Sequence, residues 1–418
     1  MLFSILALFA ASIMPALGFS SQRTDNLAVY WGQDGAGQQQ SLGFYCDDDT
    51  IDVIPLAFLY TFFGQGGMPI LDFSNICSNG GKAFSGTGLA DCSYMAADIQ
   101  KCQAKGKLIT LSLGGATANV GFGNSGDAAS FANTIWNLFL GGNGPMRPFG
   151  NAILDGVDLD IENGSSMFYD TFVNTLRSLM QSSAKKFYIT AAPQCPFPDA
   201  KVGQALSSSY FDAVYVQFYN NYCETSSPSD FNFATWDNWA KTQSLNKNVK
   251  VYLGAPGSPA AAGSGYVPPQ NLIDMARDAQ QKYSSFGGIM LWDADTAYNN
   301  NRFHVTVKNG IRNGGSAPPD TPLPSSSYTG YPNPTQTYPG SPTPTSTRTG
   351  RPRSTKPSAA PTISSSIVKV VSPTTPRPDP RASGRVRRPS SWTDNPDAEN
   401  NDELTKPMRR DSRFFRRK

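Results

Sequence analysis

Histidine is nearly absent from this chain of 418 residues, and its scarcity excludes several kinds of catalysis. Only His304 is present, so a Ser-His-Asp or Cys-His arrangement would depend on one residue that lies beyond the last recognisable motif. A zinc site built on histidines has the same difficulty. Glycine-rich phosphate and dinucleotide loops are also missing. We expect His304 on a helix surface and no metal ion or other cofactor, which leaves hydrolysis by carboxylates.

Long apolar runs are scarce as well. Residues 1–18 form one, ending in Ala16-Leu17-Gly18, and no other stretch could span a bilayer. Its length and small final residues predict a secretory signal peptide over 1–18, although the usual basic residue near the start is missing. A membrane anchor is the less favoured interpretation. No hydrophobic C-terminal run supports a lipid-anchor signal, so we expect a secreted protein, extracellular or associated with a cell wall.

Acidic and aliphatic residues alternate over residues 155–163. In a β-strand, Asp158, Asp160 and Glu162 would share one face, while the aliphatic residues between them would share the other. Three carboxylates on one face are costly, because each loses solvation when buried and neighbouring charges raise one another's pKa. A solvated acidic edge strand or a cation site would be the structural explanation. We favour the catalytic one, in which aspartates tune a proton-donating Glu162.

Eight short apolar runs recur along the chain, and most are separated by segments of helical pattern. The runs cover residues 27–31, 52–58, 107–113, 156–162, 187–192, 213–219, 249–253 and 288–292. Helical segments are predicted at 94–104, 128–139, 166–180, 236–245 and 269–283. This alternation predicts a (β/α)8 TIM barrel, an α/β fold.

Polar residues follow several of the predicted strands, at the barrel end where such folds place their chemistry. They fall in residues 112–115, 160–162, 217–221 and 292–293. The second strand contains Pro55, which cannot donate a ladder hydrogen bond. We therefore expect a bulge or a late strand start at Pro55.

The composition changes after about residue 312. Residues 313–380 are dominated by Ser, Thr, Pro and Gly and cannot bury enough apolar surface to offset their ordering entropy, which predicts a disordered stalk. Residues 381–418 form a charged, basic disordered tail. A solvated tail without a partner is the plainest interpretation. An anchor for anionic cell-wall polymers and a proteolytically processed end remain open.

The acidic motif at 155–162 resembles the signature of glycoside hydrolase family 18. Further segments resemble its class III, hevamine-like chitinases, and tails of this kind accompany fungal members. These segments are residues 30–33, 112–115, 190–199, 216–221, 263–269 and 287–292. The likeness runs from about residue 26 to residue 312, which we take as the catalytic domain. It implies an endochitinase that cuts internal β-1,4 bonds between N-acetylglucosamine units of chitin or chito-oligosaccharides.

Strand spacing alone leaves open an ordinary pair of acid and nucleophile at Asp160 and Glu162. The resemblance implies substrate-assisted, retaining catalysis instead, in which the substrate's N-acetyl oxygen is the nucleophile. Glu162 would then be the proton donor and Asp160 would hold the acetamido N–H. Asp158 would share a proton with Asp160, and the hydroxyl of Tyr219 would align the acetamido oxygen.

Five further residues are candidates for substrate binding. Trp292 would form a hydrophobic floor under the acetamido sugar, and weaker candidates for contacts along the groove are Gln217, Tyr30, Phe58 and Gly115. Asp155 fits a structural network better than a sugar contact.

The chain has six cysteines, and an even number in a secreted chain indicates disulfides, here three. Spacing leaves their pairing open. The resemblance implies Cys46–Cys102, Cys77–Cys92 and Cys195–Cys223, each holding a loop at the barrel rim.

Two other functions fit the same barrel. A non-catalytic chitin-binding lectin or inhibitor is one, although such relatives typically have the glutamate replaced, and Glu162 is intact. A hydrolase of peptidoglycan or of the N-glycan core is the other. We expect a monomer without a nucleic-acid partner.

Overall fold

The structure, a computed structural model, describes residues 18–78 and 80–312. Nearly all of the predicted signal peptide, the predicted stalk and the predicted basic tail therefore lie outside the described residues. The predicted catalytic domain, residues 26–312, lies within them except for residue 79.

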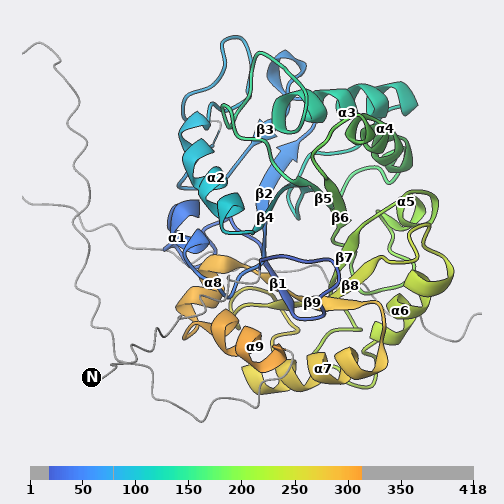
Figure 1. Cartoon of the computed structure of the whole chain (residues 1–418). Helices are drawn as coiled ribbons and strands as arrows, with labels where there is room; N and C mark the ends of the chain where they lie inside the picture. Colours follow the sequence, from blue (N-terminus) through green and yellow to red (C-terminus); the bar gives the residue numbers. More distant parts are fainter. Residues whose placement is uncertain (1–17, 79, 313–418) are drawn as a thin grey trace, which may run out of the picture. The chain divides into compact units, whose positions relative to one another are not determined.

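Eight parallel strands form a closed barrel (Figure 1). Around the ring the order is β1-β9-β8-β7-β6-β5-β4-β2, and β1 pairs with β2 to close it. The barrel strands are β1 Asn26–Val29, β2 Val53–Thr61, β4 Leu108–Gly114, β5 Gly156–Asp160, β6 Tyr188–Ala191, β7 Ala213–Gln217, β8 Lys250–Pro256 and β9 Phe286–Trp292. The short β3, Ile70–Leu71, lies antiparallel to β2. Each predicted strand overlaps one barrel strand, so the predicted TIM barrel is confirmed.

Helices lie outside the ring of strands (Figure 1). They are α1 Leu42–Cys46, α2 Ala96–Ala104, α3 Ser125–Phe139, α4 Tyr169–Gln181, α5 Gly203–Ser208, α6 Phe233–Thr242, α7 Pro269–Lys282, α8 Ala294–Asn299 and α9 Phe303–Ile311, with 3-10 turns at Gln65–Gly67 and Ser93–Met95. The five predicted helical segments correspond to α2, α3, α4, α6 and α7. Local signals start two of the helices: Asn124 caps α3 by accepting from the Asp127 backbone, and Pro269 opens α7.

The strand β5 divides its side chains between two environments. Val157 and Leu159 are buried in the apolar layer that contains residues of the surrounding helices. Asp158 and Asp160 are 0% and 3% exposed and face the barrel interior with Tyr30 and Tyr219. The alternation of faces is as predicted, and the fold turns the aliphatic residues outward and the carboxylates inward.

The bulge or late strand start predicted at Pro55 is not found at that residue. β2 begins at Val53 and runs through Pro55, which pairs with Thr110 of β4, and the register shifts only between Ala57 and Leu59. The Pro55 carbonyl accepts from the Trp31 backbone N–H at 3.0 Å, beside an isolated bridge between Trp31 and Leu56. The pairing of β1 with β2 is a single register pair, Ala28 with Val53. The β1–β2 ladder, unlike the register shift with β4, is therefore broken around Pro55, which has no N–H to donate.

The prediction for His304 was wrong. His304 lies on α9 with no exposed surface, its Nε2 is 2.9 Å from Asp48 Oδ2, and its ring stacks on Tyr298 with centroids 4.2 Å apart. Burial lowers the pKa of His304, although Asp48 opposes that shift. The carboxylate comes from the segment between α1 and β2, so only the tertiary fold brings the partner of His304 close.

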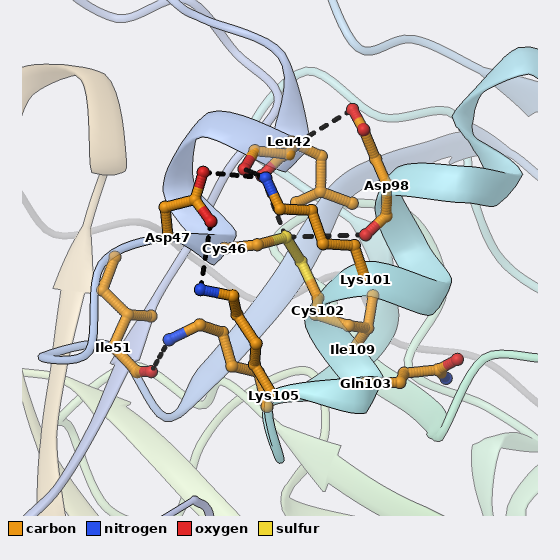
Figure 2. The surroundings of a disulfide bond; sticks show 12 residues. Leu42, Cys46, Asp47, Ile51, Asp98, Lys101, Cys102, Gln103, Lys105 and Ile109 are labelled. Carbon is orange, nitrogen blue, oxygen red and sulfur yellow. Dashed lines mark hydrogen bonds and ion pairs between the residues drawn. A yellow bond between two sulfur atoms is a disulfide. The ribbon is translucent and has the colours of Figure 1, made fainter. Parts of the chain in front are cut away.

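Three disulfides join the six cysteines in the pairing that the resemblance implies. One of them differs from the expected loop staple, because Cys46 ends α1 and Cys102 lies within α2, so it joins two helices. Figure 2 shows Lys101 and Lys105 of the same region converging on Asp47, at 2.7 and 3.0 Å. A disulfide of this kind typically stabilises the folded state by ~2–4 kcal/mol, because it restricts the unfolded chain.

Candidate active site

A cavity of about 620 Å³ opens at the C-terminal ends of the barrel strands. Seven of the nine residues predicted to act on or bind substrate line it: Phe58, Gly115, Asp160, Glu162, Gln217, Tyr219 and Trp292. Residues 114–117, at and after the end of β4, and residues 260–263, which follow β8, line it as well. Segments far apart in the sequence therefore meet here because parallel barrel strands all end on the same face.

Asp158 lies beneath the cavity and is held by three hydroxyl groups. Tyr30 and Ser112 donate to its Oδ2 at 2.6 and 2.8 Å, and Thr190 donates to its Oδ1 at 2.7 Å. Ser112 and Thr190 are its register partners on β4 and β6, so the strand pairing itself assembles this ring of donors. Burial raises the pKa of Asp158, and the three hydroxyls partly offset that rise.

Asp160 is the most perturbed carboxylate of the site. Its pKa lies well above the ordinary value because of burial first, and then because Glu162, Asp158 and other negative charge lie nearby. The amide of Gln217 donates to Asp160 Oδ1 at 2.8 Å. The negative charge of Asp158 contributes to this rise, and the proton predicted to be shared between Asp158 and Asp160 stays a prediction.

Glu162 lies beyond the end of β5 and reaches the cavity. Burial raises its pKa and Asp199 adds to that rise, while hydrogen bonds from Gln217 and Gln194 oppose it. A carboxyl group whose pKa is raised stays protonated closer to neutral pH, which a proton donor requires.

Asp199 is a carboxylate whose role the sequence analysis did not foresee. It is 8% exposed and accepts from the backbone N–H groups of Gln194, Lys201 and Val202 at 2.7–2.9 Å. It thereby fixes the loop after β6, from which the Gln194 amide reaches Glu162. In the sequence, Asp199 is only the last residue of the segment 190–199, and nothing in its spacing from Glu162 indicated their proximity.

Aromatic side chains line the cavity beside the carboxylates. The rings of Phe58 and Trp292 stack with centroids 5.6 Å apart and an interplanar angle of 21°. Gly115 has φ +94°, and a Cβ there would come within 2.8 Å of the Phe58 ring, so glycine suits both the backbone and the available space. The pKa of Tyr219 is raised well above its usual value by burial and by Asp160 and Glu162, so its hydroxyl stays protonated and can donate.

Tyr30 and Asp158 are the two predicted site residues that do not line the cavity. Tyr30 is 1% exposed and donates to Asp158, and its predicted contact along the groove stays a prediction. Asp155 accepts from the Ile109 backbone N–H at 2.8 Å and pairs with Lys185 at 2.9 Å, which is the structural network expected for it.

Comparison with known proteins places the chain in a family. Residues 26–267, more than half of the chain, match the profile of glycosyl hydrolases family 18. The chain belongs to this family. Chitinase 2 from Rhizopus oligosporus is 50% identical to this family 18 chain over 299 residues, which cover 71% of this chain and 54% of the relative. The chain spans 52–64% of the length of the first curated relatives that it matches.

Solved structures of two kinds resemble the family 18 barrel. The chitinase ICChI from Ipomoea carnea is 36% identical with a TM-score of 0.60, covering 68% of this chain and all of that one. The xylanase and alpha-amylase inhibitor protein XAIP-II from Scadoxus multiflorus is 35% identical with a TM-score of 0.58, covering 68% of this chain and 97% of that one. Enzymes and inhibitors thus share the fold, and the site has to decide between them.

Within residues 18–78 and 80–312, no three His, Cys, Asp or Glu side chains are grouped to hold a metal ion. In the same ranges no helix combines the length and the apolar character needed to cross a membrane.

Proposed function

We propose that this chain is a secreted endochitinase that hydrolyses internal β-1,4 bonds of chitin by retaining, substrate-assisted catalysis. The observation that carries the proposal is the position of Glu162, which lines a cavity together with Asp160, Tyr219 and Trp292. The similarity to chitinases of fungi and plants supports the choice of substrate.

In the first step the acetamido oxygen of the bound sugar attacks its own anomeric carbon. As that bond forms, the bond from the anomeric carbon to the leaving oxygen breaks, and Glu162 gives its proton to the leaving oxygen. The product on the enzyme is an oxazolinium ion. Asp160 accepts from the acetamido N–H and stabilises the positive charge, while the Tyr219 hydroxyl donates to the acetamido oxygen.

In the second step the ionised Glu162 takes a proton from water as the water attacks the anomeric carbon. The oxazolinium ring opens, the acetamido group is restored, and the configuration at the anomeric carbon is retained. Glu162 ends protonated, ready for another cycle. Trp292 and Phe58 cover the apolar face of the sugar and exclude water, which strengthens the electrostatic interactions around the charged intermediate.

A protein that only binds is the second candidate, because the inhibitor XAIP-II resembles this chain almost as closely as the chitinase ICChI does. Binding alone needs no proton donor, and a carboxyl group of raised pKa in a cavity costs stability. The retained Glu162 and its surroundings therefore favour hydrolysis.

Digestion of chitohexaose tests the proposal, with the lengths and anomeric form of fresh products measured by chromatography and NMR. We expect internal cuts and new reducing ends in the β configuration. New ends in the α configuration would contradict retention, and release of products from one end only would contradict endo action. Binding without cleavage would support the inhibitor or lectin. Peptidoglycan and an N-glycoprotein serve as parallel substrates. If only one of these is cleaved, it would replace chitin as the proposed substrate.

A further inference from the structure

The loop of residues 257–268, which joins β8 to α7, forms one wall of the cavity. Its part over residues 260–263 lines the cavity with nothing larger than a methyl group on any side chain. The part over 260–263 is mostly backbone and has no large side chain of its own. Later in the loop, Tyr266 packs against Phe303 and Val267 is buried. The cavity-lining part therefore depends on contacts from other residues.

Asn220 makes two side-chain contacts with the end of this cavity-lining part. Its Oδ1 accepts from the backbone N–H groups of Gly263 and Ser264 at 2.8 and 3.2 Å. Its own backbone has φ +57°, in the left-handed region that asparagine tolerates better than most residues. That conformation turns the chain at the end of β7, directly after Tyr219. Asn220 itself is exposed and lines the cavity.

Neighbouring contacts hold the same wall against the same strand end. The hydroxyl of Ser264 donates to Glu224, and the buried Thr225 donates to the Gly265 carbonyl. Gly265 has φ +91°, and a Cβ there would come within 2.6 Å of the Tyr219 Cα. The wall therefore packs directly on the backbone that carries Tyr219.

We propose that Asn220 is a positioning residue that holds the loop 257–268 as a fixed wall of the substrate cavity. Its side-chain oxygen orders the loop, so a sugar chain meets a preformed surface and does not have to order it on binding. The loss of this oxygen should weaken the binding of longer oligosaccharides more than it slows bond cleavage. The kinetic part of this inference rests on the proposed function, while the ordering of the loop does not.

Three substitutions separate the side-chain oxygen from the backbone conformation. Asn220→Gly keeps the left-handed conformation and removes the oxygen. Asn220→Ala removes the oxygen and also strains the backbone. Asn220→Asp keeps an acceptor for the two N–H groups. Asn301→Gly is the matched control, because Asn301 also has a left-handed backbone, with φ 48°, and lines no part of the cavity.

Hydrogen–deuterium exchange of peptides from 257–268 and the kcat and KM for chitohexaose are measured for each full-length variant. We expect Asn220→Gly and Asn220→Ala to exchange faster in this loop and to raise KM about tenfold, equivalent to ~1.4 kcal/mol, with kcat changed much less. Asn220→Asp should exchange like the wild type, and Asn301→Gly should match it in both readouts.

Wild-type exchange in the Asn220→Gly loop would overturn the inference. So would an Asn220→Asp variant as disordered as Asn220→Gly, because the acceptor would then not be what holds the wall. A larger fall in kcat than rise in KM would overturn the kinetic part. If the wild type cleaves no chitin oligomer, the proposed function fails, but the exchange data still decide whether Asn220 holds the loop.

Discussion

Buried carboxylates occur at both ends of the barrel, but their hydrogen-bond and ion-pair partners differ. Where the strands begin, Asp52 pairs with Lys308 at 2.5 Å, and Asp48 pairs with Arg302 at 2.7 Å and with His304. Where the strands finish, Asp158 and Asp160 have hydroxyl and amide partners, and no cation pairs with either of them among the described residues.

The pKa directions follow this difference in partners. Burial alone would raise the pKa of Asp48, but hydrogen bonds from His304, Thr50 and Tyr298 outweigh it and hold the pKa far below its usual range. The pKa of Asp160 is instead raised well above the usual range by burial and by neighbouring negative charge. Several donors converging on Asp48 keep that carboxylate ionised as part of the structure. Asp160 has one amide donor and negative charge nearby, so it holds its proton to higher pH.

The largest effect is expected from Glu162→Gln. The variant keeps the shape of the side chain and loses the proton donor, so turnover of chitohexaose should fall by roughly 10²–10⁴-fold while oligosaccharide binding persists. Rates and binding by titration calorimetry check this. A variant with more than about a tenth of the wild-type rate would remove Glu162 from its proposed role.

Asp160→Asn should lower turnover strongly while raising the melting temperature at neutral pH. The folded-state pKa of Asp160 is raised, so its ionisation costs stability, and the cost appears as the pH rises above the unfolded value of about 3.9. The asparagine removes that cost. In thermal melts between acidic and neutral pH, the rise in melting temperature over the wild type should grow with pH. A variant less stable than the wild type at neutral pH would contradict a cost of ionising Asp160.

Asp48→Asn should have the opposite profile, with lower stability and an unchanged hydrolysis rate per folded molecule. We expect a loss of ~2–3 kcal/mol, because several buried donors lose a charged acceptor. The lowered folded-state pKa means that Asp48 stabilises above about pH 3.9 and that this contribution fades as the pH falls below it. The difference in unfolding free energy between variant and wild type should therefore shrink in acid. A constant difference would argue against ionisation as its cause.

Asp199→Asn tests the electrostatics of the site more finely. The charge of Asp199 raises the pKa of Glu162, so its removal should lower that pKa and move the alkaline limb of the kcat/KM profile to lower pH. Asp278→Asn, in an exposed pair with Lys282 on α7, is the control and should leave the profile in place. An alkaline limb that stays put in Asp199→Asn would assign the tuning to burial alone.

The smallest effect is expected from a chain that ends at Arg312. All barrel strands and every residue given a catalytic or binding role precede that position, so both ends of the barrel should keep their properties. Melting temperature and rates on soluble oligomers should match those of the full chain. The shortened chain should be retained less on insoluble cell walls. If the basic residues cause retention, salt should weaken the retention of the full chain, since the screening length falls to ~3 Å at 1 M salt. A truncated form that melts much lower would place the domain boundary elsewhere.

The sequence by itself determined the strand order, most strand positions and the common face of Asp158 and Asp160. These features depend on local periodicity and on the rule that parallel barrel strands end on one face. The resemblance of the motifs to the family supplied the disulfide pairing and the candidate site residues.

Only the tertiary structure decided which groups surround the carboxylates. Ser112 and Thr190 reach Asp158 because of the register between strands, and Asp199 influences Glu162 because two loops converge. His304 is buried because α9 packs near the segment that carries Asp48. Asn220 accepts a hydrogen bond from a loop more than forty residues away. Such contacts join residues that no short-range pattern relates. The closed barrel brings these residues together, so it sets the pKa directions and the contrast between the two ends of the barrel.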